Sequence, residues 1–377
     1  MKVMVIIYHD INTEERTKEI VNMACYLGDT FFVSYKKNTI EGNYKTLLTG
    51  GGRRSYFSFI SDAIRYIYVY KPQVIILHDN YTAIILALLK ITKSKAFIIF
   101  DSSELYIVKY GGTSLKLRAA NIMKLLEKKY LKYANLVICA SKERAEIMLH
   151  YYQLKKMPMC FDNMHKLVEQ FDEIECEKKY GRYIDKSVFK VLYGGGISNS
   201  RRTLELVKAV GNFGEKFMLI VVGFATNEEV DKFNKLVHDN NFKNIFYLGF
   251  LPRSEWQYLM NHSDVSVSVF AMDTPNNINC ASGKVYESLF AYKPVLVSEN
   301  PPLKRLCNEY GIGVSDDNFY DGLKELQRNY AGYVENVKKF VAHINYSDRA
   351  KLLSEEIKDS NEWKEWLDKQ SAWGKRK

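Results

Sequence analysis

A short segment near residue 285 combines a small-residue turn, a lysine and a glutamate at spacings that suit a ligand with phosphate and hydroxyl groups. The turn Ser282-Gly283 precedes an expected helix, whose first N–H groups lack partners inside the helix and can face an anion. Lys284 opposes the helix dipole unless a negative ligand lies in front of it. Glu287 follows on nearly the same face and suits the hydroxyl groups of a ribose or sugar. The alternative is an amphipathic helix with a surface Lys–Glu pair.

A glycine run and two arginines form a second candidate phosphate site. Gly194, Gly195 and Gly196 follow an expected strand and permit close approach of the backbone to a ligand. Arg201 or Arg202, at the start of the next helix, could clamp a phosphate with two hydrogen bonds, and solvated arginines are the alternative. The glycines lack the spacing GxGxxG of dinucleotide-binding loops. The chain also has no GxxxxGK(S/T) loop, which argues against a P-loop nucleotidase.

Polar residues directly follow the apolar strands in the first half of the chain. They occur at 8–10 (Tyr-His-Asp), 78–80 (His-Asp-Asn) and 101–104 (Asp-Ser-Ser-Glu). Ligands of parallel α/β sheets bind at the carboxyl ends of the strands. Asp101 and Glu104 are therefore candidates for contact with a sugar, with capping of the following turn as the alternative role for Asp101.

The elements that must position these residues alternate between strands and helices. In the first half we expect strands at 3–8, 31–34, 74–78, 96–100 and 136–140, helices at 13–27, 58–70, 81–89, 115–133 and 141–152, and a loop at 36–54. In the second half we expect strands at 189–193, 217–222, 245–248, 265–270 and 294–297, again with helices between them. Continuous Val/Ile/Leu strands alternating with helices predict parallel sheets covered on both faces. At 377 residues the α/β chain has room for two doubly wound domains, which we place at 1–165 and 166–345, followed by a helical segment at 346–377.

Composition narrows the class of partner. The net charge of +10 favours nucleotide phosphates, an anionic membrane face or nucleic acid, and nucleic acid is not expected because no recognised motif accompanies the charge. The six cysteines have no metal-binding spacing and predict reduced thiols in the cytoplasm. We expect no signal peptide or membrane span, since the longest apolar stretch, 83–89, is far below the roughly 18 residues that a span needs.

From residue 191 to 314 the sequence resembles the donor-binding half of a family-4 glycosyltransferase with the two-domain GT-B fold. The matching segments are YGGGISNSRRTLELVKA, LIVVGFA, NIFYLGFLPRSEWQYLMNHSDVSVSVF, NCASGKVYESLFAYKPVLVS and GIGV. The first half matches more loosely, through its initial strand, IIFDSSELY and ANLVICASKERAEIM.

The resemblance implies two Rossmann-like domains that face a cleft, the first on the acceptor side and the second binding the donor, with the final helix returning to the first domain. It implies transfer of a sugar from a nucleoside diphosphate sugar to a hydroxyl group, usually with retention of configuration and without a metal ion or cofactor. Arg201 and Lys284 would hold the donor diphosphate, and Glu287 corresponds to the second glutamate of an E-x7-E motif that contacts the donor ribose. The implied donor-binding residues are Gly195, Gly196, Arg201, Ser282, Gly283, Lys284 and Glu287.

The chain departs from the family pattern at three places. The first glutamate of the E-x7-E motif is replaced by Asn279, which can hydrogen-bond sugar hydroxyls but carries no charge. The glycine-arginine pair after the first donor-domain strand reads Gly195-Gly196, and Ser103 stands where related sequences tend to have histidine. The candidates for a catalytic role are Asp101, Glu104 and Asn279, and with no obvious base the leaving phosphate itself could deprotonate the acceptor.

These departures keep two other functions open. A GT-B epimerase would convert a nucleotide sugar without an acceptor. A catalytically silent GT-B partner subunit would keep the fold and bind nucleotide without turnover.

A basic helix at 115–133 suggests contact with an anionic membrane. Read with Arg53-Arg54 and the aromatic run 56–59, it could dock on anionic lipid at the inner face of the cell membrane, and the acceptor would then be a lipid-linked glycan, as in bacterial surface-polysaccharide assembly. The alternative is a helix with one face on the sheet and its lysines in water. The basic residues on and before this helix are Lys109, Lys116, Arg118, Lys124, Lys128, Lys129 and Lys132.

Overall fold

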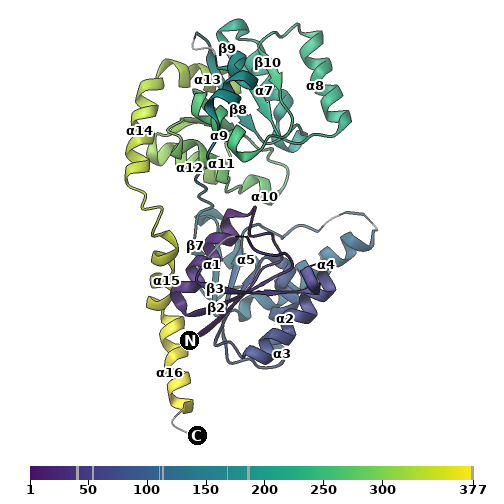
Figure 1. Cartoon of the computed structure of the whole chain (residues 1–377), viewed down its shortest axis with the longest axis vertical. Coiled ribbons are helices and arrows are strands. Elements are labelled where there is room, and N and C mark those ends of the chain that lie inside the picture. Colours follow the sequence, from purple (N-terminus) through teal and green to yellow (C-terminus); the bar gives the residue numbers. More distant parts are fainter. Residues whose placement is uncertain are drawn as a thin grey trace. The chain divides into compact units, whose positions relative to one another are not determined.

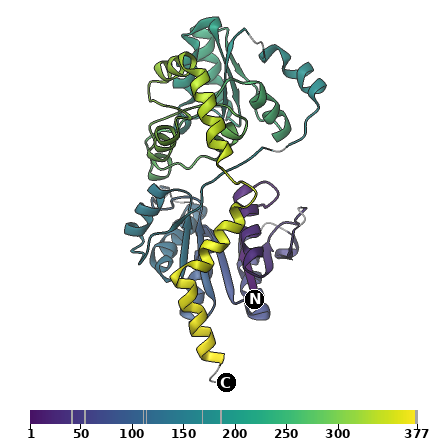
Figure 2. The same ribbon diagram turned by 90° about the vertical axis from the view of Figure 1, so that its left-hand side faces the viewer.

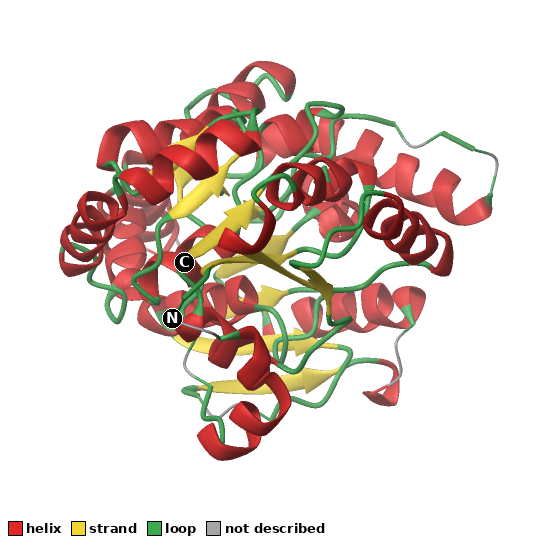
Figure 3. Ribbon diagram, turned by 90° about the horizontal axis from the view of Figure 1, so that it is seen from above, coloured by secondary structure: helices red, strands yellow, loops and turns green. Residues whose placement is uncertain are grey.

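The chain divides into two compact units, each built around one parallel sheet (Figure 1). The first unit comprises Met1–Asp162 and Asn345–Lys377, and the second comprises Asn163–Ile344. The computed structural model describes residues 1–39, 42–52, 55–109, 111–112, 114–167, 169–184 and 187–374. Arg53 and Arg54 of the predicted membrane-facing cluster lie outside the described residues. Helices cover both sheets, as Figure 3 shows in red around the yellow strands, which confirms the prediction of two doubly wound α/β domains.

The first unit contains a seven-stranded sheet in the order β3-β2-β1-β4-β5-β6-β7, with all pairs parallel. Its strands are β1 (Lys2–Ile6), β2 (Asp29–Ser34), β3 (Tyr44–Leu48), β4 (Val74–His78), β5 (Phe97–Ser102), β6 (Leu136–Cys139) and β7 (Met159–Cys160). Its helices are α1 (Glu15–Leu27), α2 (Tyr56–Tyr70), α3 (Ala83–Ile91), α4 (Leu115–Tyr130), α5 (Lys142–Tyr151), α15 (Arg349–Asp359) and α16 (Asn361–Gly374). Every residue of β4 and β5 is buried, as expected for strands covered on both faces.

The predicted loop at 36–54 is wrong in part, because it contains the edge strand β3. This strand pairs in parallel with β2. Its sequence, YKTLL, has no continuous apolar run, and Leu47 is its one buried residue. An edge strand has neighbours on one side only and needs few apolar residues, so the hydrophobic pattern gave no signal.

The second unit contains a six-stranded parallel sheet in the order β10-β9-β8-β11-β12-β13. Its strands are β8 (Phe189–Gly194), β9 (Phe217–Val222), β10 (Ile245–Tyr247), β11 (Val265–Ser268), β12 (Val295–Val297) and β13 (Gly313–Ser315). Its helices are α6 (Glu173–Tyr180), α7 (Thr203–Gly211), α8 (Asn227–Asp239), α9 (Arg253–His262), α10 (Pro275–Ile278), α11 (Gly283–Phe290), α12 (Pro301–Tyr310), α13 (Phe319–Arg328) and α14 (Tyr330–Ala342).

Each sheet reverses its strand order at one place. In the first unit the reversal lies between β1 and β4, and in the second it lies between β8 and β11. At such a point the connections that follow the two neighbouring strands run in opposite directions. This opens a crevice at the carboxyl ends of these strands. His9 and Asp79 follow β1 and β4, whereas Gly194 and Ser268 end β8 and β11. The topology therefore places polar and small residues where ligands of this fold class bind.

Helix α4 turns apolar side chains toward solvent. The exposed fractions of Leu115, Ile122 and Leu125 are 82%, 52% and 51%, while Lys124 and Glu127 are buried. Burial raises the pKa of Glu127 to about 8, so the inner face of this helix carries a carboxyl group that favours its neutral form. In the described part of the chain, no helix combines the length and the apolar character that a membrane span requires.

The C-terminal helices pack on the first unit. Helix α15 lies against α1, and α15 and α16 follow one face of that unit (Figure 1, Figure 2). Trp363 and Trp366 are buried against Phe97 of β5, with ring centroids 4.9 and 5.5 Å from that of the phenylalanine. The Trp366 Nε1–H donates a hydrogen bond to the carbonyl of Lys95 at 3.0 Å. These contacts make the C-terminal segment part of the hydrophobic core.

We expect Trp366→Ala to lower the free energy of unfolding by about 3–5 kcal/mol, because it removes a buried indole and leaves a cavity. Leu367 is the matched control, since its side chain is 43% exposed and its truncation should cost less than about 1 kcal/mol. Urea unfolding followed by circular dichroism measures both variants. Equal losses in the two variants would contradict this packing role.

Candidate functional site

A cavity of about 290 Å³ opens in the second unit at the carboxyl end of β8 and the start of α11. Its lining includes glycines, two phenylalanines, an indole and charged side chains. The residues that matter below are Gly195, Phe224, Phe250, Trp256, Lys284 and Glu287. Gly195, Lys284 and Glu287 were predicted from the sequence as parts of one site, and the structure brings them into one cavity.

Lys284 and Glu287 form a fixed pair on the first turn of α11. Lys284 Nζ lies 3.0 Å from Glu287 Oε2 and 4.7 Å from the centroid of the Trp256 ring. The same Oε2 accepts a hydrogen bond from the Trp256 Nε1–H at 3.0 Å, and Oε1 lies 3.8 Å from His165 Nδ1. The Lys284 side chain remains 42% exposed, so its ammonium group can still meet a ligand.

The electrostatic environment keeps Glu287 ionised. Burial alone would raise the pKa of this carboxyl, but contacts with His165 and Lys284 outweigh burial and lower the pKa to about 2. The side chain is thus an acceptor-only group, suited to hydroxyl donors, beside a cation suited to phosphate.

Two close contacts explain why residues 194 and 196, at and after the end of β8, are glycines. A Cβ on Gly194 would lie 2.3 Å from the Trp256 indole, and one on Gly196 would lie 2.1 Å from the carbonyl oxygen of Phe224. Gly196 also has a φ of +76°, a backbone angle that residues other than glycine rarely adopt. The run therefore lets the end of β8 pack tightly against the neighbouring loop and the indole.

The structure separates the two arginines that the sequence left as alternatives. The guanidinium of Arg202 pairs with Glu205 and Asp317 and lies over the Phe319 ring. Arg201 stacks on Phe270, 4.3 Å from the ring centroid, and among the described residues no carboxylate pairs with it. Arg202 is therefore occupied, and Arg201 is the better phosphate candidate. Arg201 does not, however, line the 290 Å³ cavity.

Contacts at the end of β11 bring Arg201 and the start of α11 to the same strand. The Ser268 hydroxyl donates to Ser282 Oγ at 2.9 Å, and Ala271 N–H donates to the carbonyl of Ser200 at 2.9 Å. A Cβ on Gly283 would lie 2.4 Å from His165 Nδ1, so this glycine admits the histidine ring. Ser282 makes no side-chain cap to α11.

Asn279 has a structural contact at the end of α10. It is 7% exposed, and its Nδ2 donates to the carbonyl of Pro275 at 2.9 Å. The amide therefore supports the turn before α11. A catalytic role for Asn279 stays a prediction.

In the first unit, Asp101 is fully buried between Arg16 and His78. Its Oδ2 accepts from Arg16 Nε at 3.0 Å and lies 2.6 Å from His78 Nδ1. Burial alone would raise the pKa of Asp101, but Arg16 and His78 lower it. The assignment of Asp101 as a catalytic residue stays a prediction. Glu104 is more exposed and pairs with Arg144 at 3.2 Å.

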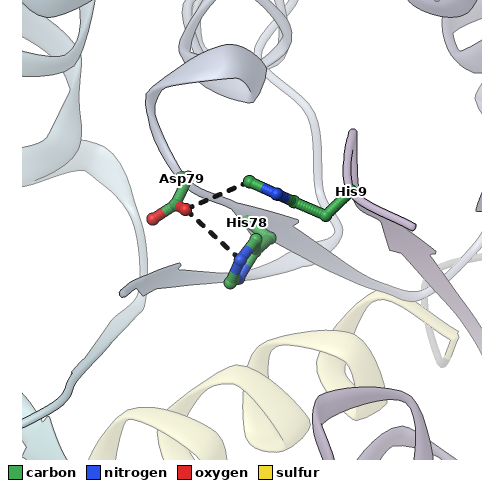
Figure 4. Close-up of side chains that lie close together, drawn as sticks. All are labelled: His9, His78 and Asp79. Atoms are coloured by element: carbon green, nitrogen blue, oxygen red, sulfur yellow. Dashed lines mark ion pairs between the residues drawn. The ribbon is translucent and has the colours of Figure 1, made fainter. Parts of the chain in front are cut away.

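Asp79, next to His78, collects several contacts (Figure 4). Its Oδ1 accepts from the backbone N–H of Ser103 at 2.8 Å, and its Oδ2 accepts from the Ser103 hydroxyl at 2.7 Å. The same Oδ2 lies 3.3 Å from His78 Nε2 and 3.4 Å from His9 Nε2. Ser103, which stands where the resemblance led us to expect histidine, thus holds this carboxylate.

The spacing of His9, His78 and Asp79 raises the question of a metal ion, since one potential ligand atom from each lies within 4.8 Å of the others. A metal would need the lone pair of His78 Nε2. Burial lowers the pKa of His78, but Asp79 and Asp101 outweigh burial and raise it, which favours a proton on that ring. No other such group occurs in the described ranges of the chain. The absence of a metal ion from the reaction stays a prediction.

Sequence patterns missed the partners that hold these groups. Trp256 and His165 contact Glu287 from positions 31 and 122 residues earlier in the chain, and Arg16 contacts Asp101 across 85 residues. The segments 8–10 and 78–80 were recognised as strand ends, which is the signal that could have pointed to His9 and Asp79.

Comparison with known proteins identifies the fold. No family profile and no curated protein matches the sequence. Sucrose-phosphate synthase from Thermosynechococcus elongatus superposes with a TM-score of 0.71 at 15% identity, over 95% of this chain and 98% of that one. WaaG, a glycosyltransferase of lipopolysaccharide biosynthesis, gives 0.67 at 12% identity, over 96% and 100%. Anabaena HepE in complex with UDP gives 0.69 at 12% identity, over 96% and 100%. The chain therefore has the GT-B fold, and at these identities the likeness shows the fold alone.

We expect Glu287→Gln to destabilise the protein at pH 7 and to have little effect near pH 2. A carboxyl whose pKa is lower in the folded than in the unfolded state, where it is about 4.3, stabilises the fold above that value and loses this effect as the pH falls toward 2. The cost at pH 7 should be about 1–3 kcal/mol. Thermal unfolding at pH 7, 5 and 3 measures it, with the exposed Glu335→Gln as the control. A loss that did not shrink as the pH falls would contradict the assignment.

Proposed function

We propose that this protein is a glycosyltransferase that moves a sugar from a nucleoside diphosphate sugar to a hydroxyl acceptor. The observation that carries the proposal is the fixed group of Lys284, Glu287 and Trp256 at a glycine-walled cavity of a GT-B fold. The cavity lies at the end of β8, one of the two strands between which the order of the second sheet reverses. A lysine for phosphate and an ionised carboxylate for hydroxyl groups match the two polar parts of such a donor.

Departure of a nucleoside diphosphate builds negative charge on its phosphate oxygens. In our proposal Lys284, the N-terminal end of α11 and Arg201 stabilise this charge, so that no divalent ion is needed. Glu287 accepts hydrogen bonds from the ribose hydroxyls. Metal independence and retention of configuration rest on the family resemblance and form part of the proposal.

Two stacked aromatic rings offer a place for the nucleobase. Phe224 and Phe250 line the cavity and are exposed, with ring centroids 4.4 Å apart and planes inclined by 16°. We propose that the base stacks on this pair, since aromatic faces accept any base. HepE has structures with UDP and with UDP-glucose, which supports uridine compounds as the first ligands to test.

We expect UDP or another nucleoside diphosphate to stabilise the wild-type protein, by about 2.7 kcal/mol at one hundred times the dissociation constant. Lys284→Ala should lose this shift and sugar transfer, because it removes the cation beside the phosphates. Lys304→Ala is the matched control, since Lys304 lies on α12 and pairs with Glu299. Thermal shift with UDP, GDP and ADP, with and without EDTA, measures binding.

Each outcome of this titration has a defined meaning. No stabilisation by any nucleotide would overturn the proposed function. Binding with conversion of the nucleotide sugar in the absence of an acceptor would favour an epimerase. Binding without turnover on any acceptor would favour a silent partner subunit.

We also propose that the first unit associates with an anionic membrane surface through α4. The exposed apolar residues Leu115, Ile122 and Leu125 recur at helical spacing. Phe57 of α2 is 86% exposed, and its neighbour Tyr56 hydrogen-bonds Met123 Sδ at 3.1 Å, which ties α2 to α4. The exposed cations on and after this helix are Lys116, Arg118, Lys128, Lys129 and Lys132. Apolar side chains for the acyl boundary and cations for the headgroups fit an interfacial helix.

A membrane-bound acceptor follows from this part of the proposal. The protein would act at the inner face of the cell membrane, and its acceptor would be a glycan linked to a lipid, as in surface-polysaccharide biosynthesis. The neighbour WaaG is a glycosyltransferase involved in lipopolysaccharide biosynthesis, which is in keeping with such an acceptor.

We expect the protein to float with phosphatidylcholine vesicles that contain phosphatidylglycerol and not with phosphatidylcholine alone. The triple variant Leu115→Ser, Ile122→Ser, Leu125→Ser should lose most of this binding, because it removes the apolar contact and keeps the charge. The matched control is Ile174→Ser on α6, which is 67% exposed in the second unit. Wild-type flotation by the triple variant would contradict the assignment of this surface.

A further inference from the structure

Two cysteines stand side by side on neighbouring strands of the first unit. Cys139 ends β6 and Cys160 ends β7, and the register of these two parallel strands pairs them directly. The Phe161 N–H donates to the carbonyl of Cys139 at 2.8 Å, which extends the pairing one residue beyond β7. Neither cysteine belongs to the donor cavity, which the second unit forms alone.

Both thiols point to the same face of the sheet. Side chains alternate between the two faces along a strand, and residues paired across two strands share a face. Ile138, Met159 and Phe161, the sequence neighbours of the two cysteines, pack in or against the hydrophobic cluster on one face. Cys139 belongs to the cluster on the other face. Cys160 must therefore point to that second face, beside Cys139.

The spacing of paired strands suits a disulfide. Neighbouring strands lie about 4.7–4.9 Å apart. Disulfides join residues whose Cα atoms are about 4.4–6.8 Å apart and whose Cβ atoms point the same way. The thiols of Cys139 and Cys160 already interact in the reduced state, and this interaction is the largest influence on the pKa of each. Rotation of the two side chains is therefore enough to bring the sulfur atoms together.

The two thiols differ in access and in acidity. Cys160 is exposed, whereas Cys139 has no exposed surface. Contact with Cys139 lowers the pKa of Cys160, against burial and the carboxylates of Asp162 and Glu143, which raise it. Contact with Cys160 and burial both raise the pKa of Cys139. Cys160 is thus the thiol that meets an oxidant, and Cys139 is the thiol placed to displace the adduct.

The remaining four cysteines lie outside the strands of the described chain. Cys25 is on α1, Cys176 on α6 and Cys307 on α12, and Cys280 lies in the turn before α11. They provide internal controls for any reaction of the paired thiols.

The pair lies where the chain leaves the first unit. β7 is an edge strand of two residues, and the second unit begins at Asn163. Between them, the carbonyl of Phe161 accepts from Arg16 Nη1 at 2.7 Å, and the carbonyl of Asp162 accepts from Arg349 Nη2 at 2.6 Å. Because β7 has β6 as its one neighbour in the sheet, a covalent bond to β6 would add directly to these contacts.

An exposed and a buried thiol on paired strands are suited to reversible oxidation. We propose that Cys139 and Cys160 form a disulfide on exposure to a low-molecular-weight disulfide, and that this bond fixes β7 to β6 at the exit from the first unit. Both thiols are free in the structure, and they stay reduced in a reducing compartment. The modification is independent of the proposed function and needs no nucleotide.

Oxidation proceeds by two exchange steps. The Cys160 thiolate attacks one sulfur of oxidised glutathione, forms a mixed disulfide and releases one glutathione thiolate. The Cys139 thiolate then attacks the Cys160 sulfur of this adduct, forms the protein disulfide and releases the second glutathione thiolate. The protein gives up two protons and two electrons, and the glutathione disulfide is reduced to two thiols. Excess reduced thiol reverses both steps.

Peptide mapping of the full chain tests the bond. The wild-type protein is treated with oxidised glutathione, denatured in N-ethylmaleimide and digested with trypsin without reduction. The tryptic peptides 133–142 and 157–166 contain Cys139 and Cys160 as their only cysteines, so the bond would join these two peptides. We expect the joined peptides as the main oxidised product and their separation by dithiothreitol. No disulfide, or a bond to another cysteine, would overturn the proposal.

Single variants test the order of attack. Cys139→Ser should stop at the mixed disulfide and keep one glutathione on Cys160, whereas Cys160→Ser should form neither product. Cys139→Ala replaces the serine variant should that variant fail to fold by circular dichroism. Cys25→Ser is the matched control and should form the disulfide as the wild type does, since the Cys25 thiol donates to the backbone of α1. Glutathione retained on Cys160 of the wild-type protein would overturn the proposal, because Cys139 would then not reach the adduct.

Hydrogen exchange measures the effect on β7. We expect the Phe161 amide, which is bonded to the carbonyl of Cys139, to exchange about tenfold more slowly in the oxidised protein, because the disulfide restricts opening of the strand pair. Exchange in α7 of the second unit should stay the same in both forms. Equal exchange of the Phe161 amide in the oxidised and reduced proteins would overturn the assigned effect of the bond.

Discussion

Reversal of strand order in a parallel sheet is the constraint on which the structure depends. Helices cover both faces of each sheet, so the side chains that meet a ligand come from the strand ends, from the loops that follow them, and from the helix turns beside those loops, as Lys284 and Glu287 do on α11. The first sheet reverses between β1 and β4 and the second between β8 and β11. His9 and Asp79 lie at the first reversal, and the glycine run and Ser268 lie at the second. The topology thus places these residues where ligands of this fold class bind.

In both units, a buried carboxylate is held by more than one partner. Glu287 is fixed by Trp256, Lys284 and His165, and these contacts outweigh the cost of its burial. In the first unit, Asp101 is held by Arg16 and His78. A buried carboxylate with one partner would be expensive, whereas a carboxylate with several is fixed in position before any ligand arrives. Such preorganisation is what a reaction that develops charge needs from the protein.

Sequence patterns predicted the features that depend on neighbouring residues and missed the contacts between residues that are far apart in the chain. Alternating apolar strands and helices gave the two sheets, and the turn before α11 gave Lys284 and Glu287 as neighbours. The edge strand β3 was missed because a strand with one buried residue has no hydrophobic pattern. The choice between Arg201 and Arg202 depended on Asp317, more than a hundred residues away, which occupies Arg202. Trp256, His165 and Arg16 have no signal in the sequence around them, since their partners approach only in the folded chain.

The departures from the family pattern have physical consequences that differ between the two units. The side-chain amide of Asn279 donates a hydrogen bond to the carbonyl of Pro275. Asparagine in place of the glutamate of the family pattern therefore removes a charge and supports the turn before α11. Ser103 makes two hydrogen bonds to Asp79, one from its backbone N–H, which any residue here could make, and one from its hydroxyl, which a histidine would not make in the same way because its ring nitrogens lie farther from the backbone. The serine thus leaves the carboxylate in place and leaves His9 as the partly exposed histidine beside it. A departure from the family pattern after β5 is therefore compatible with an ordered arrangement of polar groups after β1 and β4.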